Sequence, residues 1–446
     1  MSTLDAERVG PTNSRRLLSP GTTGWAQSAQ PADPDRYLVI TVDSHVSEPA
    51  DVWAQGGLPD SYKDRTPRMF TDEQGRQFIF AEGHKRPQLV KGRPKGTEYE
   101  AKYEREGLGT AGMMWSDRME PDDLLRMRAA ATVIADEPTL SRIRADLYRD
   151  GVDAAVVFAN RGQHSFLTPD PVFAAAMSHA WNAWALSTYG QHPDQFVAAG
   201  QVAMGDIDLA VKEIEWLAEN SFRAINIPCA VPDGDTEWVG YNHESYDRVW
   251  AAFQVAGIPV CMHVATGRDP RAATGSGGAI INKAVGFLKG VMEPLAHILA
   301  SGVFERFPDI RFATIEADIG WIPWFLEALD LAYYKHHMWV RPVMSEPPSH
   351  YWYANCAASV LEDKPGLHLV REFDLIDHVM WSNDYPHHEG TWPHSSQAIE
   401  RQLDQFTEEE RQKLLGRTAA TLFGFDETRL LDMRGSPPDL ACASSI

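Results

Sequence analysis

Long apolar runs are missing from this sequence, and none approaches the roughly eighteen residues needed to cross a bilayer. The N-terminal residues also lack the apolar centre of a secretory signal. These absences predict a soluble, cytoplasmic protein with no membrane partner. Positive charge is scarce as well, because 41 Lys and Arg face 62 Asp and Glu, which gives a formal charge of −21. Since such a surface repels phosphate backbones, nucleic acid is not an expected partner.

Cysteine is rare, and no two cysteines form a CxxC pair. The four residues are far apart, and three of them end or lie within apolar runs. They are Cys229, Cys261, Cys356 and Cys442. We expect them to be small buried side chains in a reducing compartment rather than a disulfide framework.

Short apolar runs alternate with amphipathic stretches along most of the chain. The runs are continuous rather than alternating in polarity, as in parallel strands that are covered on both faces. The predicted strands are residues 37–43, 152–159, 196–202, 223–228, 258–263, 311–316, 351–356 and 378–384. Eight such βα alternations predict a (β/α)8 barrel of the TIM type, with a doubly wound sheet as the competing topology. No GxGxxG motif follows a predicted strand, which weakens the second option.

One large domain accounts for most of the length. Residues 1–36 lack periodicity and predict a flexible N-terminal tail, residues 37–430 form the barrel, and residues 431–446 form a C-terminal tail. A long insertion after the first strand covers about residues 50–138. Because loops after barrel strands leave the C-terminal rim, this insertion is a candidate lid, and a solvated surface excursion is the equal alternative for its charged half.

Five ionisable residues fall at the ends of predicted strands: Asp43, His45, His263, Glu316 and Asp384. In a barrel the C-terminal ends of all strands meet at one face, so these residues would share a pocket. A residue of this kind taken alone is more often a cap or a satisfied polar group. Imidazoles and carboxylates gathered on rigid strand ends are the ligands that a divalent ion needs. The joint pattern therefore predicts a metal site.

At this point the chain resembles the amidohydrolase superfamily, within it the amidohydrolase-related branch that includes aminocarboxymuconate-semialdehyde and γ-resorcylate decarboxylases. The resemblance runs from about residue 37 to 426 and rests on six blocks in the same order. They are "VDSHVSEPADVW", "DGVDAAVVF", "HPDQFVAAGQVAMGDIDLAVKEIEWLAENSFRAINIP", "LAHILASGVFERFPDIRFATIEADIGWIPW", "WSNDYPHHEGTWP" and "LLGRTAATLFGFD". The fold of this superfamily is a (β/α)8 barrel, and its members often form dimers or tetramers. The resemblance therefore implies a homo-oligomer.

The resemblance also implies a ligand set for one Zn²⁺ or Mn²⁺ ion. Asp43 and His45 match the first-strand ligand pair, and His263 matches the strand-five histidine. Asp384 matches the strand-eight aspartate, which contacts the metal and handles protons. Many members end the sixth strand with a histidine, whereas this chain has "IEADIGWIP", so that role is empty or passes to Glu316.

Several further residues are candidates for substrate contact or for orienting the ligands. Glu48, three residues after His45, looks like the recurrent acidic residue of this branch, with N-capping as the alternative. Arg161 and Arg268 follow strands two and five and are placed to hold an anion, or to form rim salt bridges. Of the adjacent His387 and His388, we expect at most one to face the pocket.

The predicted function is non-oxidative decarboxylation of a small cyclic or aromatic carboxylic acid, with Asp384 protonating the carbon that loses CO₂. Hydrolysis of a C–N, C–O or C–C bond is the alternative, with Asp384 or Glu316 as the base that activates water. A barrel that binds metal without catalysis is a third option. In each case the expected partner is a small anionic molecule.

Overall fold

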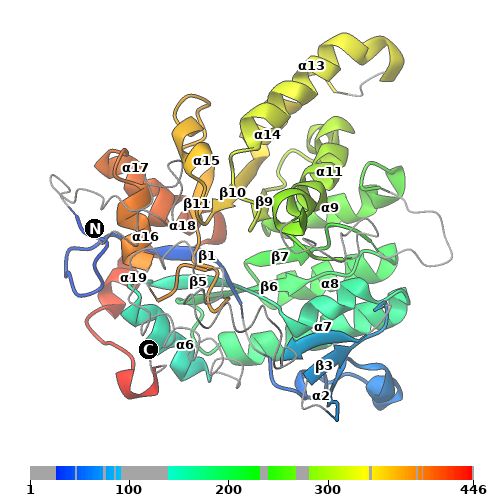
Figure 1. The fold of residues 1–446 in the computed structure, drawn as a ribbon. Coiled ribbons are helices and arrows are strands. Elements are labelled where there is room, and N and C mark those ends of the chain that lie inside the picture. Colours follow the sequence, from blue (N-terminus) through cyan, green and yellow to red (C-terminus); the bar gives the residue numbers. More distant parts are fainter. Residues whose placement is uncertain are drawn as a thin grey trace.

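The structure is a computed structural model, which describes residues 27–45, 48–73, 77–84, 87–91, 139–231, 240–267, 281–340, 344–387, 390–393 and 395–443. Within these residues, eight parallel strands are hydrogen-bonded in the order of the chain, with helices between them (Figure 1). The strands are β1 (Ile40–His45), β5 (Ala154–Phe158), β6 (Phe196–Gln201), β7 (Ala224–Ile227), β8 (Val260–His263), β9 (Phe312–Ile315), β10 (Cys356–Val360) and β11 (Val379–Trp381).

The two end strands of this sheet meet, so the sheet closes into a barrel. Ser44 and Tyr385 form a parallel bridge between β1 and the segment after β11. The backbone N–H of Asp384 donates to Asp43 O at 3.0 Å, and the N–H of His45 donates to Tyr385 O at 2.5 Å. This topology confirms the predicted (β/α)8 barrel and excludes the doubly wound sheet.

Helices lie between the barrel strands, and several of them begin or end at a recognisable capping residue. Asp206 accepts a hydrogen bond from Leu209 N at the start of α8, and the left-handed Gly257 ends α9. The helices of the barrel wall and C-terminal part are α6 (Leu140–Arg149), α7 (Pro171–Tyr189), α8 (Ile207–Glu219), α9 (Asp247–Ala256), α11 (Phe287–Ala300), α12 (Val303–Arg306), α13 (Ile322–Val340), α14 (Pro348–Asn355), α15 (Lys364–Leu369), α16 (Ser395–Gln402), α17 (Glu408–Gln412), α18 (Thr418–Phe423) and α19 (Glu427–Met433).

The predicted seventh strand, residues 351–356, is wrong. Residues 351–355 belong to α14, which starts at Pro348, and only Cys356 lies in the strand, which is β10, Cys356–Val360. Pro at the first helical position favours a helix start, because its missing N–H would have no partner there. Tyr351, Trp352 and Asn355 are buried at helical spacing, and a short apolar run of this kind does not distinguish a buried helix from a strand.

The insertion after β1 begins with α2 (Val52–Gln55) and a 3₁₀ turn, η2 (Asp60–Arg65). An antiparallel sheet of three strands follows, β2 (Arg68–Thr71), β3 (Gln77–Phe80) and β4 (Gln88–Lys91). Arg65 bonds Glu82 at 2.7 and 2.8 Å and reaches Asp170, which caps α7, at 3.0 Å. These bonds tie the start of the insertion to the barrel wall. Residues 92–138, the remainder of the predicted lid, lie outside the described residues.

Three of the four cysteines fit the expectation of buried side chains, and the fourth does not. Cys229, Cys261 and Cys356 are buried free thiols, and Cys442 is exposed. Among the described helices, none has the length and apolar character that a membrane crossing requires. A cytoplasmic location remains a prediction.

Both ends of the described chain pack on the barrel near the start of β5. The buried Asp153 carboxylate accepts hydrogen bonds from Arg36 at 2.7 and 2.9 Å. Arg434 donates to the same two oxygens at 2.9 and 2.7 Å. One carboxylate therefore fixes residues from the predicted N-terminal and C-terminal tails, whose outer parts, 1–26 and 444–446, lie outside the described residues.

Replacing Asp153 by Ala should lower the free energy of unfolding by about 3–5 kcal/mol, because it leaves Arg36 buried without its anion. Urea denaturation of the full chain measures this change. The matched control is Asp208→Ala, which breaks the exposed pair with Arg248 and should cost at most about 1 kcal/mol. Equal losses in the two variants would contradict the assignment.

Candidate metal and catalytic site

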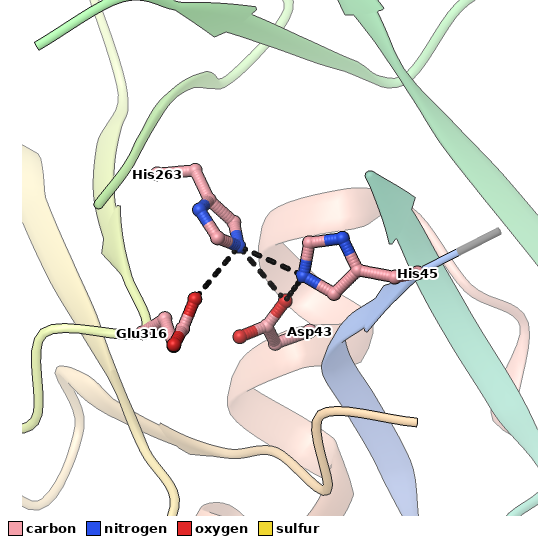
Figure 2. Close-up of side chains that lie close together, drawn as sticks. All are labelled: Asp43, His45, His263 and Glu316. Atoms are coloured by element: carbon pink, nitrogen blue, oxygen red, sulfur yellow. Dashed lines mark hydrogen bonds and ion pairs between the residues drawn. The ribbon is translucent and has the colours of Figure 1, made fainter. Parts of the chain in front are cut away.

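Four predicted site residues meet at the C-terminal face of the barrel. Asp43 and His45 lie on β1, His263 ends β8, and Asp384 follows β11. The Nε2 atom of His263 lies 3.2 Å from Asp43 Oδ1 and 3.1 Å from His45 Nε2 (Figure 2). Asp384 Oδ1 lies 3.5 Å from His45 Nε2. All four side chains are buried, so one water-poor cluster unites residues that are far apart in the sequence.

The geometry of this cluster fits one divalent ion. Ligand atoms about 2.1 Å from an ion lie about 3.0–3.4 Å from one another in octahedral or tetrahedral geometry. The separations among Asp43 Oδ1, His45 Nε2 and His263 Nε2 are 3.1, 3.2 and 3.3 Å. The Oδ2 atoms of Asp43 and Asp384 are buried, and neither accepts a hydrogen bond from the described residues. Because a buried carboxylate oxygen without a partner is costly, the donor set calls for a cation.

Burial and neighbouring charges shift the pKa values of the ligand side chains. Burial disfavours charge on His45 and lowers its pKa to about 4, so this ring is neutral at pH 7. Burial opposes ionisation of Asp43 too, but His263 outweighs it and holds the pKa of the carboxyl well below its usual range. For His263 burial is again the largest effect, yet Asp43 and Glu316 together raise its pKa to about 9. A cation that binds here therefore displaces a proton from His263.

The ring of His263 is fixed from its far side. Its Nδ1 lies 2.8 Å from Val264 O, so Nδ1 keeps its proton and the displaced proton is the one on Nε2, whose lone pair then faces the cluster. Its backbone N–H donates to Asn226 Oδ1. Both contacts hold the imidazole in the orientation that a metal ligand needs.

Glu316 joins this cluster directly after β9. Its Oε2 lies 3.4 Å from His263 Nε2 (Figure 2). Its backbone N–H donates to Ser359 Oγ at 2.8 Å. Burial and the charge of Asp384 raise the pKa of Glu316 to about 8. Glu316 and Asp384 both have left-handed backbones, with φ of 58° and 51°. Such strain in non-glycine residues is concentrated at functional sites.

His387 is the described member of the histidine-rich loop, and it faces the cluster. Its Nδ1 lies 2.9 Å from Asp384 Oδ1, and its ring stacks on His45 with centroids 4.0 Å apart. Its Nε2 lies 3.1 Å from Asn160 Oδ1. Burial opposes charge on His387, but Asp384 outweighs it and raises the pKa to about 9. His388, Glu389 and His394 lie outside the described residues.

Glu48 holds a loop. Its carboxylate accepts hydrogen bonds from the backbone N–H groups of residues 160, 161 and 162 at 2.8, 2.8 and 3.1 Å, and from Trp181 Nε1 at 2.9 Å. It thereby caps the 3₁₀ helix η3 (Arg161–Leu167). The alternative expectation, that Glu48 caps the helix directly after it in the sequence, does not predict this contact. Fully buried Glu48 thus positions Asn160, the partner of His387.

Of the two arginines predicted to bind an anion, only one lies within the described residues. Arg161 is described, and its guanidinium contacts Met69 Sδ at 3.5 Å on the small sheet rather than the ligand cluster. Arg268 lies outside the described residues. Sequence reasoning missed Lys283, whose Nζ lies 3.7 Å from Glu316 Oε1. No periodicity or motif around Lys283 indicates this contact.

The sequence and the fold of this chain were compared with those of known proteins. A family model described as amidohydrolase matches residues 42–425. No curated protein matches the sequence. A solved amidohydrolase from Mycobacterium avium subsp. paratuberculosis is 19% identical, with a TM-score of 0.65, and 88% of this chain and 99% of that chain are covered.

Two further solved structures share the barrel. A 5-carboxyvanillate decarboxylase from Sphingomonas paucimobilis is 18% identical, with a TM-score of 0.58 and coverage of 87% and 100%. A 5-carboxyvanillate decarboxylase from Novosphingobium aromaticivorans, complexed with manganese and 4-hydroxy-3-methoxy-5-nitrobenzoic acid, is 16% identical, with a TM-score of 0.59 and coverage of 89% and 98%. At sequence identities this low, the structural similarity shows a common fold.

Glu48→Gln should lower the free energy of unfolding by about 1–3 kcal/mol, because an amide cannot accept all the bonds that converge on the carboxylate. The control is Glu82→Gln, which changes a half-exposed pair with Arg65 and should cost at most about 1 kcal/mol. Chemical denaturation compares the two. A stable Glu48→Gln protein would rule out the loop-holding role.

Proposed function

This chain belongs to the amidohydrolase family, and we propose from that premise that it is a metal-dependent carboxy-lyase acting on a small cyclic or aromatic carboxylic acid. The observation that carries the proposal is the buried cluster at the strand ends, in which Asp43, His45 and His263 lie within 3.3 Å of one another and Asp384 lies 3.5 Å from His45. Glu316 forms a possible ligand group with the first three residues, and His387 forms one with His45 and Asp384. A solved relative of the same fold, a decarboxylase complexed with manganese and a substituted benzoic acid, supports this choice of reaction.

The four residues of the cluster would hold one divalent ion, Zn²⁺ or Mn²⁺. Two imidazole nitrogens and two carboxylates suit both metals. When bound, the ion supplies positive charge that holds the substrate's oxygens and stabilises the charge that develops during reaction.

Asp384 is the proposed proton donor. In decarboxylation the C–C bond to the carboxylate breaks, its electron pair stays on the ring carbon, and a proton from Asp384 forms the new C–H bond as CO₂ leaves. The backbone bond from Asp384 N to Asp43 O fixes the carboxyl. His387 Nδ1, 2.9 Å from Asp384 Oδ1, is placed to return the proton.

Glu316, whose carboxylate lies beside His263, is the proposed base. The positive charge of a bound ion would favour the ionised form of Glu316, which lies in a left-handed turn directly after β9. The carboxylate would then accept a proton from a substrate hydroxyl beside the group that is lost. His387 would contact the substrate as well, while Glu48 acts indirectly by holding the loop at Asn160. Arg161 and Arg268 remain proposed contacts for the acid group at the rim.

Hydrolysis is the second candidate, favoured by one observation: a carboxylate lies beside each of the two histidines, Asp384 beside His45 and Glu316 beside His263. Either carboxylate could take a proton from water during cleavage of a C–N, C–O or C–C bond. The two functions differ in whether water becomes part of the product. A homo-oligomer, dimer or tetramer, remains a prediction for either.

The reaction is tested by incubating the Mn²⁺-loaded protein with hydroxybenzoic and other cyclic acids in ¹⁸O-labelled water. Decarboxylation predicts released CO₂ and no label in the ring product, whereas label in a product acid or alcohol indicates hydrolysis. Asp384→Asn should lower kcat by about 10²–10⁴-fold, because the proton donor is lost. Asp208→Asn, at an exposed position, is the control.

Metal binding gives an independent test. Protein stripped with a chelator should gain about 2.7 kcal/mol of stability when Mn²⁺ is supplied at one hundred times its Kd. His263→Ala should abolish the gain and the bound metal, while His243→Ala, an exposed histidine, should keep both. Thermal unfolding and elemental analysis measure these effects, and an undiminished gain in His263→Ala would refute the ligand assignment.

A further inference from the structure

Lys283 links the metal cluster to the solvent-facing part of the site. It lies on a π-helical turn, η5 (Asn282–Gly286), just before α11. Its Nζ lies 3.7 Å from Glu316 Oε1, and the other oxygen of that carboxylate lies 3.4 Å from His263 Nε2. The Lys283 side chain is 45% exposed, whereas that of Glu316 is 8% exposed. A single buried carboxylate therefore separates an accessible ammonium from a proposed metal ligand.

A pocket of about 260 Å³ lies at this point, and Lys283 is the cation among its described lining residues. Glu316, Asp318 and Asp363 line the same pocket. Asp363 accepts hydrogen bonds from the backbone N–H groups of Ile319 and Gly366 at 3.0 and 2.9 Å, and also from Gly320. Its negative charge is thus met by the backbone.

The other acidic wall residue is also engaged by the backbone. Asp318 Oδ1 accepts from Leu361 N at 3.2 Å. Trp321 forms an aromatic part of the wall, and its Nε1 donates to Ala317 O at 2.9 Å. An aromatic surface beside one ammonium is suited to a planar ring that carries an anionic substituent.

We propose that Lys283 binds a second acidic group of the substrate, so that the enzyme prefers rings with two acidic substituents over rings with one. The inference rests on the proposed function: the group that is lost lies at the metal cluster, and the second carboxylate or phenolate pairs with Lys283 near Trp321. Glu316 keeps the Lys283 ammonium directed toward the cluster. Lys283 is therefore a specificity-determining residue.

Binding of two probes to the Mn²⁺-loaded full chain tests this assignment. Benzoate carries one carboxylate, and isophthalate carries a second on the same ring. Calorimetry should show the protein binding isophthalate about 10–100-fold more tightly than benzoate, as expected for a charge-assisted hydrogen bond. Lys283→Met should remove most of that preference and leave the metal content unchanged. Lys283→Arg should retain part of it, and Lys212→Met, an exposed lysine on α8, should retain all of it.

Other outcomes overturn the proposal. If Lys283→Met weakens both probes equally, the residue is only a counter-charge for Glu316. If neither probe binds the loaded protein, the pocket does not hold such acids. The inference and the proposed function fail separately: a Lys283-dependent preference without any CO₂ release would refute decarboxylation alone, and CO₂ release with an unchanged preference in Lys283→Met would refute the role of Lys283 alone.

Discussion

Barrel closure between β1 and the segment after β11 is the constraint on which the site depends. The hydrogen bonds from Asp384 N to Asp43 O and from His45 N to Tyr385 O join the first and last strands. The same residues supply the clustered side chains, so the bonds that close the fold also set the spacing of the carboxylates and the imidazole. A change that breaks these hydrogen bonds between the first and last strands would separate Asp384 from Asp43, even where the backbone around each residue keeps its own conformation.

A buried polar network supports the contact between the first and last strands. Asp150 accepts hydrogen bonds from Ser395 and from the side chain of Asn383, the residue before Asp384. Asn383 N in turn donates to Thr41 Oγ1 at 3.0 Å, on the strand that carries Asp43. Catalytic groups need neighbours that lock their positions, and here helix α6, the first strand and the last loop share that task. This explains buried polar residues that touch no ligand atom.

The sequence alone predicts the barrel and the cluster for one reason: side chains at the ends of parallel strands must meet. That argument places Asp43, His45, His263 and Asp384 without any knowledge of the loops. It fails at residues 351–356, where an apolar run fits helix and strand equally. It also cannot assign Glu48, because the amides that it binds follow β5, more than a hundred residues away. Likewise the loop backbone, and not the sequence, turns His387 toward Asp384.

Charge balance explains how an anion can enter a site lined by acids in a chain of formal charge −21. Asp43 and Asp384 both lie close enough to Glu316 to raise its pKa, so three carboxylates come together here, and without cations they would repel an acidic substrate. A divalent ion and the ammonium of Lys283 together offset three negative charges, and His387, whose pKa is raised beside Asp384, adds a positive charge. The two cations lie beside different carboxylates, Lys283 beside Glu316 and His387 beside Asp384. A ring with acidic groups at two positions can therefore meet positive charge at both, while the surrounding acidic surface disfavours anions elsewhere on the protein.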